Sequence, residues 1–246
     1  MRREITGFSN PLLKEIRGLR EKKLRKRAGL FLAEGLRIMT EAREAGFLPE
    51  MLFRVKDRPV HALEIALEDE VLRNGGDVIE TSAEIMAKLS GKDNAQAVVG
   101  VYRDHGTALD DIERATAPIW LVAQAMRDPG NLGTMLRTGD AVGAGGLILI
   151  DDCTDPFSVE AVRASMGAVF TQKIVQCRWD EFMTWLRAGD GQLVGTSLQT
   201  DTDYQAAHYS SPCFILTGNE AQGLPDDYEV QCDLLVKMPM HGKADS

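Results

Sequence analysis

The stretch that most constrains the fold is DPGNLGTMLRTGDAVGAGGLILI, which runs from Asp128 to Ile150. The apolar run of Ile119 to Ala123 precedes it and ends at a polar residue and a turn-forming Asp-Pro-Gly, as expected of a buried strand that enters a loop. Asn131 stands where a helix N-cap is expected, apolar residues then recur at helical spacing, and glycines from Gly143 end that pattern. The apolar run of Leu147 to Ile150 predicts a second strand.

The order strand, helix, strand predicts a β-α-β crossover within a parallel sheet. Open sheets of this kind bind ligands beyond the carboxyl ends of their strands. We therefore expect the loop from Gln124 to Asn131 to lie at a ligand-binding edge. Several predicted strands deliver glycine-bearing loops to this edge, and a shared pocket is the economical inference. These loops are Asp128 to Gly133, Thr196 and Ser197, Thr217 to Gly223, and Met238 to Gly242.

Three segments in the second half of the chain resemble the ordered signatures of one family. The SpoU family of RNA ribose methyltransferases, in the knotted SPOUT superfamily, has a first signature that resembles Asn131, Gly133, Arg137, Thr138, Ala141 and Gly143. LTGNEAQGLP, from Leu216 to Pro225, resembles the second signature. KMPMHGKADS, from Lys237 to Ser246, resembles the first half of the third. Three matches in the right order are far more specific than one short glycine pattern.

The resemblance implies an α/β fold with two domains. In the family, a C-terminal parallel-sheet domain contains a deep trefoil knot, and a smaller N-terminal ribosomal-protein-like α/β domain often binds the RNA substrate. Strands and helices alternate from Met51 to Arg103, whereas Asp104 to Pro118 is polar and lacks a strong strand pattern. We therefore predict an RNA substrate-binding domain over residues 1–108 and a methyltransferase domain over residues 109–246.

The resemblance also implies an activity, a cofactor and partners. It indicates an S-adenosylmethionine-dependent enzyme that methylates a ribose 2′-hydroxyl in structured RNA, with ribosomal RNA favoured and transfer RNA possible. It further implies a homodimer through the C-terminal domain. The implied catalytic residues are Arg137, Asn131 and Glu220. The implied cofactor-binding residues, which act mainly through backbone groups, are Thr196, Leu216, Gly218, Met238 and Ser246.

Each of these site residues also has a structural interpretation that the sequence leaves open. In the family the arginine that matches Arg137 activates the hydroxyl, but a guanidinium at its ordinary pKa donates hydrogen bonds and is no base. We interpret Arg137 as positioning the ribose or a phosphate, and the proton acceptor stays open. The alternative is an exposed helical arginine paired with Asp140 at i+3. Asn131 can simply cap its helix, Glu220 can be a solvated loop residue, and Gly218 can serve turn geometry.

The net charge of −9 hides a partition that favours RNA binding. Residues 1–30 hold 10 Lys or Arg against 3 Glu, a net charge of +7, which leaves −16 for the remainder. A helix is predicted from about Pro11, with Asn10 as its N-cap, and a basic segment on one face is typical of nucleic-acid binding. The alternative is a solvated surface helix. Its cations are Arg17, Arg20, Lys22, Lys23, Arg25, Lys26 and Arg27, of which Arg20, Lys22, Lys23, Lys26 and Arg27 are the candidate RNA-binding residues.

Other classes of site find no support in the sequence. Four widely spaced cysteines form no CxxC pair, and four scattered histidines form no ligand pattern, so we expect free buried thiols and no metal. No apolar run reaches the roughly 18 residues of a membrane span, and we expect a cytoplasmic protein. A P-loop string does not occur, and the glycine spacing of GNLGTM differs from a dinucleotide fingerprint.

Two rival functions remain open. One is a non-catalytic RNA-binding or ribosome-assembly protein that retains the knotted fold; the other, disfavoured by the missing phosphate motifs, is a nicotinamide- or nucleotide-using enzyme. In the family, the third signature continues beyond the serine that matches Ser246 into a C-terminal helix, which completes the cofactor pocket and builds much of the dimer interface. We expect the polypeptide to continue beyond this point, and a chain that ended there would favour the non-catalytic rival.

Overall fold

In the computed structural model, which describes residues 1–92 and 94–240, the chain forms two units. The first comprises Met1–His105 and Asp155–Thr171, and the second comprises Gly106–Thr154 and Gln172–Ser246. The predicted α/β class is confirmed, because both units combine a sheet with helices. The predicted boundary after residue 108 and the trefoil knot stay predictions.

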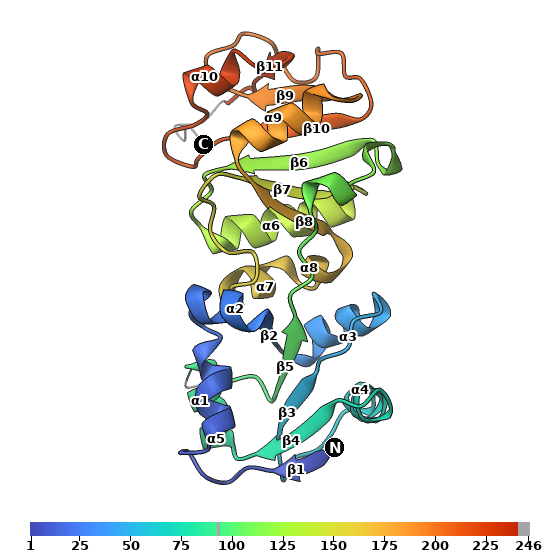
Figure 1. Cartoon of the computed structure of the whole chain (residues 1–246), viewed down its shortest axis with the longest axis vertical. Helices are drawn as coiled ribbons and strands as arrows, with labels where there is room; N and C mark the ends of the chain where they lie inside the picture. Colours follow the sequence, from blue (N-terminus) through green and yellow to red (C-terminus); the bar gives the residue numbers. More distant parts are fainter. Residues whose placement is uncertain (93, 241–246) are drawn as a thin grey trace. The chain divides into compact units, whose positions relative to one another are not determined.

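The first unit is built on a mixed sheet of five strands in the order β1-β4-β3-β5-β2. β4 pairs in parallel with β1 and β3, whereas β5 runs antiparallel to β3 and β2. Figure 1 shows α1 and α5 on one side of this sheet and α3 and α4 on the other. The strands are β1 (Arg2–Glu4), β2 (Leu30–Glu34), β3 (Met51–Val55), β4 (Asp77–Thr81) and β5 (Val98–Arg103). The helices are α1 (Pro11–Gly18), α2 (Lys22–Ala28), α3 (Leu36–Glu44), α4 (Ala62–Arg73), α5 (Ala83–Ser90), α7 (Val159–Ser165) and α8 (Ala168–Thr171).

The basic N-terminal segment forms two helices and not the single helix predicted. Asn10 caps α1 as expected, because its side chain accepts a hydrogen bond from the backbone N–H of Leu12 at 2.9 Å. Gly18 ends α1, and α2 begins after a short turn. A Cβ at Gly18 would lie 2.9 Å from the side chain of Leu24 on α2. Glycine, with its low helix propensity, therefore both ends α1 and lets α2 pack closely.

Arg25 is not part of an exposed basic face, contrary to the prediction. It is 5% exposed, and its Nη2 and Nε donate to Oδ2 of Asp155 at 2.7 and 3.0 Å. Its Nη1 donates to the carbonyl oxygens of Leu19 and Arg20 at 2.8 and 2.7 Å. Since Asp155 is 130 positions away in the chain, this buried ion pair fixes α2 to the segment of residues 155–171 within the first unit.

The second unit contains a six-stranded sheet in the order β11-β9-β10-β6-β7-β8, and its paired strands are parallel. The predicted β-α-β unit is confirmed as β6, α6 and β7. The strands are β6 (Ile119–Gln124), β7 (Gly146–Ile150), β8 (Lys173–Cys177), β9 (Gln192–Thr196), β10 (Cys213–Thr217) and β11 (Leu234–Val236). The helices are α6 (Pro129–Ala141), α9 (Trp179–Arg187) and α10 (Asp226–Glu229), with short 3-10 turns η1 (Leu109–Asp111) and η2 (Arg114–Thr116).

The start of α6 corrects one prediction. The N-cap is Asp128 and not Asn131: Oδ1 of Asp128 accepts a hydrogen bond from the backbone N–H of Asn131 at 2.7 Å. Pro129 occupies the first helical position, where its fixed φ suits the helix and its missing N–H has no cost. Asn131 is therefore inside the first turn, and its side chain is available for another contact.

The described residues contain neither a membrane-spanning helix nor a cluster of metal ligands. None of their helices is long and apolar enough to cross a membrane. They also contain no group of three or more His, Cys, Asp or Glu that could hold a metal ion. The four cysteines are free, with Cys153 and Cys213 buried and Cys177 and Cys232 partly buried.

The buried ion pair predicts a large stability effect. Asp155→Ala leaves the Arg25 guanidinium buried without its counter-charge, so we expect the free energy of unfolding to fall by about 3–5 kcal/mol. Urea denaturation of the full chain measures this change. Asp201→Ala removes the exposed partner of Lys237 and is the matched control, which should leave stability almost unchanged. Similar small effects from both substitutions would contradict the structural role of the buried pair.

Candidate active site

The candidate site begins where β6 and β10 end side by side. These strands pair in parallel with Thr217 opposite Ala123, so the loops that follow them leave the same edge of the sheet. The side-chain Nδ2 of Asn219 donates to the carbonyl oxygen of Ala125 at 2.9 Å. Backbone hydrogen bonds in both directions between Asn219 and Gly223 close the loop after β10. Two loops that are 94 positions apart in the chain are thus held together.

Glu220 fixes the loop that leads into α6. Its Oε2 accepts a hydrogen bond from the backbone N–H of Arg127 at 3.2 Å, and its Oε1 accepts one from the N–H of Asp128 at 3.1 Å. The side-chain Nδ2 of Asn131 also donates to Oε1, at 3.4 Å. Partial burial opposes ionisation, but these hydrogen bonds outweigh it and lower the pKa of the Glu220 carboxyl. The structure therefore brings Asn131 and Glu220 together around a stable carboxylate.

Ala125 carries backbone strain at the same place. Its φ is 48°, in the left-handed region that residues other than glycine rarely adopt. Its N–H donates to the carbonyl oxygen of Ile150 at 3.1 Å, and its own carbonyl oxygen accepts the hydrogen bond from Asn219. A strained conformation of this kind persists only where surrounding contacts hold it in place, and such residues are concentrated at functional sites.

Arg137 lies on the exposed side of α6, two turns beyond the loop that Glu220 holds. Among the described residues its guanidinium has no hydrogen-bond or ion-pair partner, so its donors face solvent. Among the described residues, Arg137 forms no hydrogen bond or ion pair with Glu220 or Met238, and the convergence of these three residues on one ligand remains a prediction. An exposed arginine of this kind can bind a phosphate or a ribose oxygen from solution.

Four of the predicted cofactor-binding residues lie in the last two residues of a strand or just beyond it: Thr196 in β9, Leu216 in β10, Gly218 after β10 and Met238 after β11. The hydroxyl of Thr196 donates to the carbonyl oxygen of Leu216 at 3.2 Å, which links β9 to β10. Thr196 lies opposite Val236, so the segments after β9 and β11 start side by side. Two apolar residues in these segments are largely exposed, Leu198 at 65% and Met238 at 62%. Ser246 lies outside the described residues.

Gly218 has a sufficient structural reason to be glycine. A Cβ at this position would overlap the backbone of Gly223 and Leu224, where the loop after β10 folds back. Any side chain would force this loop to move. The close approach of backbone to backbone therefore accounts for the residue, and a contact of Gly218 with a cofactor remains a prediction.

Sequence reasoning missed a second polar cluster at the same sheet edge. Asp151 directly follows β7, and its Oδ2 accepts hydrogen bonds from the hydroxyl of Tyr228 at 2.8 Å and from Nε2 of Gln124 at 3.3 Å. The Tyr228 ring stacks on Trp179 with centroids 3.9 Å apart. Burial and the Asp151 carboxylate raise the pKa of the Tyr228 phenol. The rule that placed Gln124 at the edge also applies to Asp151, whereas Tyr228 gave no signal.

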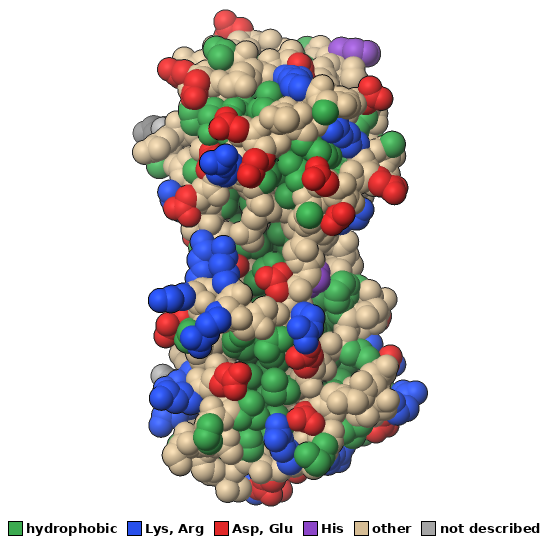
Figure 2. Space-filling view, viewed as in Figure 1, with side chains coloured by type: hydrophobic (Ala, Val, Ile, Leu, Met, Phe, Trp, Pro, Cys, Tyr) green, Lys and Arg blue, Asp and Glu red, His purple; other side chains and the backbone are tan. Residues whose placement is uncertain are grey.

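Four of the five predicted RNA-binding cations lie exposed on α2 or directly at its end: Lys22, Lys23, Lys26 and Arg27. Figure 2 shows Lys and Arg side chains gathered where Figure 1 places α2. Arg20 differs, because it is half-buried and its Nη1 is buried without a hydrogen-bond partner among the described residues. The exposed basic surface of α2 therefore consists of these four residues.

Comparisons with known proteins agree along the whole chain. A family model described as the SpoU rRNA Methylase family matches residues 118–246, and one described as the MRM3-like substrate binding domain matches residues 10–100. A 23S rRNA (guanosine-2′-O)-methyltransferase of Bacillus subtilis is 28% identical and covers 99% of this chain and 93% of its own length. A 23S rRNA (uridine-2′-O)-methyltransferase of Streptomyces viridochromogenes is 30% identical and covers 90% and 79%, respectively.

Solved structures give the same result. The crystal structure of an AdoMet-bound rRNA methyltransferase from Sinorhizobium meliloti is 36% identical, covers 100% of this chain and 92% of its own, and has a TM-score of 0.91. The AdoMet complex of a SpoU methyltransferase from Streptomyces viridochromogenes is 28% identical, covers 96% and 91%, and has a TM-score of 0.85.

The hydrogen bonds of the Glu220 carboxylate predict how the loop changes when this carboxylate is replaced. Glu220→Gln replaces one acceptor oxygen by an amide that cannot accept from a backbone N–H. We expect hydrogen exchange at the amides of Arg127 and Asp128 to rise on the order of tenfold, because hydrogen bonds to charged groups are stronger than neutral ones. Mass spectrometry of the peptide that spans residues 125–131 measures this exchange.

The control for this substitution is Glu113→Gln, which changes an exposed carboxylate elsewhere in the second unit. Since the folded-state pKa of Glu220 is lower than the value of about 4.3 for a free glutamate, the carboxylate contribution is complete above that pH and is lost only as the pH falls below it. Unchanged exchange in Glu220→Gln at neutral pH would contradict the proposed fixing of the loop.

Proposed function

We propose, from the premise that this chain belongs to the SpoU rRNA methylase family, that it transfers the methyl group of S-adenosylmethionine to a ribose 2′-hydroxyl of ribosomal RNA. The observation that carries this proposal is the full-length agreement with the AdoMet-bound rRNA methyltransferase of Sinorhizobium meliloti. Ribosomal RNA is favoured over transfer RNA, because the two relatives described above are named for methylation of 23S rRNA. A reaction on ribosomal RNA also favours the cytoplasm as its location.

The residues at the ends of β9 and β11 fit the cofactor. S-adenosylmethionine would supply an activated methyl group, carried on a sulfonium between a neutral adenosine and a charged amino-acid end. Leu198 and Met238 offer exposed apolar surface beside the backbone of Thr196, which suits adenine. The Lys237 ammonium forms an ion pair with the Asp201 carboxylate at 2.9 Å, so an acidic side chain balances the positive charge of Lys237. We assign the cofactor to the backbone of Thr196, Leu216, Gly218 and Met238, and to Ser246 outside the described residues.

Arg137 is the catalytic residue that we propose. Its guanidinium has no partner among the described residues and can donate two parallel hydrogen bonds to a phosphate or to ribose oxygens. In this role it holds the 2′-oxygen in line for attack, and positioning of this kind makes a large contribution to rate. Glu220 and Asn131 act indirectly, because their hydrogen bonds order the loop from which α6 starts. No proton acceptor is assigned.

The first unit is proposed to hold the RNA. The match of residues 10–100 to a substrate-binding domain and the four exposed cations of α2 support this assignment. In domain terms, residues 1–108 bind RNA and residues 109–246 carry the methyltransferase. We further propose a homodimer through the C-terminal domain, where Val230, Met238 and Met240 are 82%, 62% and 50% exposed. Sedimentation equilibrium of the full chain tests the dimer.

Replacement of Arg137 tests the catalytic assignment. We expect Arg137→Ala to lower kcat about a hundredfold while affinities for S-adenosylmethionine and RNA change little, because the residue positions the reacting oxygen. The assay combines the full-length gene product, labelled S-adenosylmethionine and ribosomal RNA that lacks the modification, and then maps ribose methylation. Arg73→Ala, an exposed arginine on α4, is the matched control.

Three outcomes would overturn these assignments. Label on a base would contradict ribose methylation. Equal activity of Arg137→Ala and the unchanged protein would remove Arg137 from catalysis. RNA binding without any methyl transfer would favour a non-catalytic protein that retains the fold.

Reversal of the α2 charges tests the RNA-holding surface. Changing Lys22, Lys23, Lys26 and Arg27 to Glu should weaken RNA binding strongly and flatten its salt dependence, because each phosphate contact releases counterions. Affinity for S-adenosylmethionine should stay the same. Fluorescence anisotropy at several salt concentrations measures RNA binding, and calorimetry measures the cofactor. Unmoved RNA affinity would mean that α2 is only a solvated surface.

A further inference from the structure

A small cavity lies between α1 and α5 in the first unit, and none of the residues that line it is assigned a role above. Its volume is about 130 Å³. Leu13, Ile85 and Leu89 form an apolar floor and are 7%, 2% and 2% exposed. An apolar cavity of ~150 Å³ in another protein admits benzene, so this one has the size for a single six-membered ring.

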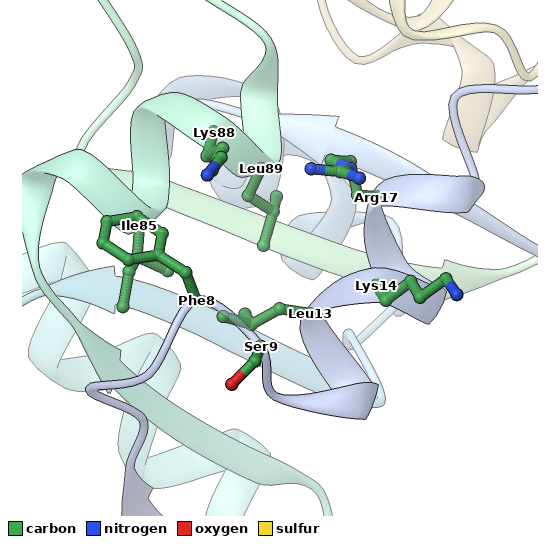
Figure 3. A pocket seen from close by; sticks show the side chains of 8 residues that line it. All are labelled: Phe8, Ser9, Leu13, Lys14, Arg17, Ile85, Lys88 and Leu89. Atoms are coloured by element: carbon green, nitrogen blue, oxygen red, sulfur yellow. The ribbon is translucent and has the colours of Figure 1, made fainter.

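Phe8 lies at the rim of this cavity and is 53% exposed. The Lys88 ammonium lies over its ring, 4.6 Å from the centroid, which is a cation–π contact. Figure 3 shows the Phe8 ring beside Ile85, with Lys88 above it. The ring is thus held from one side, while half of the residue stays open to solvent. A large aromatic side chain in this position offers a flat face to a planar ligand.

The rim is positively charged. Lys14, Arg17 and Lys88 line the cavity, and none of its lining residues is acidic. Lys14 and Arg17 are exposed and have no ion-pair partner among the described residues. In Figure 3 the Arg17 guanidinium points toward Leu89 at the gap between the helices, whereas Lys14 extends away from it. The site therefore combines an apolar floor, an open aromatic ring and two cations at its mouth.

These features are complementary to one ligand class, a base joined to a phosphate. Bases stack on exposed aromatic rings, and lysine and arginine bind the adjoining phosphates. We propose that this cavity binds one unpaired nucleotide of the RNA substrate, with its base against Phe8 and its phosphate at Lys88 and Arg17. This proposal rests on the proposed function for the presence of RNA, and it adds a single-stranded element to the substrate.

The cavity should discriminate little among bases. Apart from Ser9, the lining side chains are apolar or are cations that only donate hydrogen bonds, so the cavity offers almost no acceptor to a base edge. Every base has a stacking face, and binding through stacking and charge tolerates sequence. A paired base cannot reach Phe8, because its faces are covered within the duplex. Selection is therefore for an exposed nucleotide and not for its identity.

Binding of labelled RNA octamers to the full chain tests this site. We expect Phe8→Ala to weaken binding of single-stranded octauridine on the order of tenfold. Phe8→Tyr should retain binding. Phe8→Leu should weaken binding as much as Phe8→Ala does, because leucine keeps the bulk of the side chain but has no aromatic face. Lys88→Ala should lower the salt slope by somewhat less than one unit. Ile65→Ala and Arg73→Ala, on α4 across the sheet, are the matched controls and should have no effect.

Several outcomes would overturn the nucleotide site. The first is that the unchanged protein does not bind octauridine. The second and third are that Phe8→Ala or Phe8→Leu binds octauridine as tightly as the unchanged protein does. The fourth is that Phe8→Ala weakens binding of a duplex of the same length as much as it weakens binding of octauridine. Competition by free uridine monophosphate as strong as by the octamer would mean a free-nucleotide pocket and would also overturn it. Absence of methyl transfer alongside the expected octamer results would instead contradict only the proposed function.

Discussion

The parallel pairing of β10 with β6 is the constraint on which the candidate site depends. β10 is inserted between β6 and β9, so the chain returns to the middle of the sheet after β6, β7 and β8 have formed on one side of this position and β9 on the other. The loops that follow β6 and β10 therefore begin next to each other at the same edge of the sheet. Glu220 and Asn219 use this proximity, because both hydrogen-bond to the segment that joins β6 to α6.

The same segment is held by hydrogen bonds within the protein itself. Ala125 is held in a left-handed conformation by hydrogen bonds on both sides of its peptide unit, and the backbone N–H groups of Arg127 and Asp128 are held by one carboxylate. A helix that starts from a fixed loop presents its exposed side chains in fixed directions. The strain at Ala125 is therefore consistent with preorganisation of α6 and of the arginine that it carries.

The sequence predicted the elements of the second unit well, because buried parallel strands are continuous apolar runs between turn residues. The predictions were wrong where contacts between distant parts of the chain, and not local preferences, determine the structure. Asn131 and Asp128 are both good N-caps, and only the position of Pro129 decides between them. Arg25 has the appearance of a surface cation, because its partner Asp155 lies 130 positions away and no local pattern indicates that distance. The contact of Glu220 with two backbone N–H groups is equally non-local.

As proposed, the first unit would contact RNA in two physically different ways. The cations of α2 are exposed and unspecific, so they attract a phosphate backbone of any sequence or pairing state. The cavity between α1 and α5 adds a requirement for an exposed base, because its floor is apolar and its rim carries an aromatic ring. Charge alone would bind every structured RNA, including abundant RNA that is no substrate. In this proposal, the stacking site and the basic surface together would restrict productive binding to RNA that offers both an unpaired nucleotide and a phosphate backbone, and this combination would supply selectivity without reading sequence.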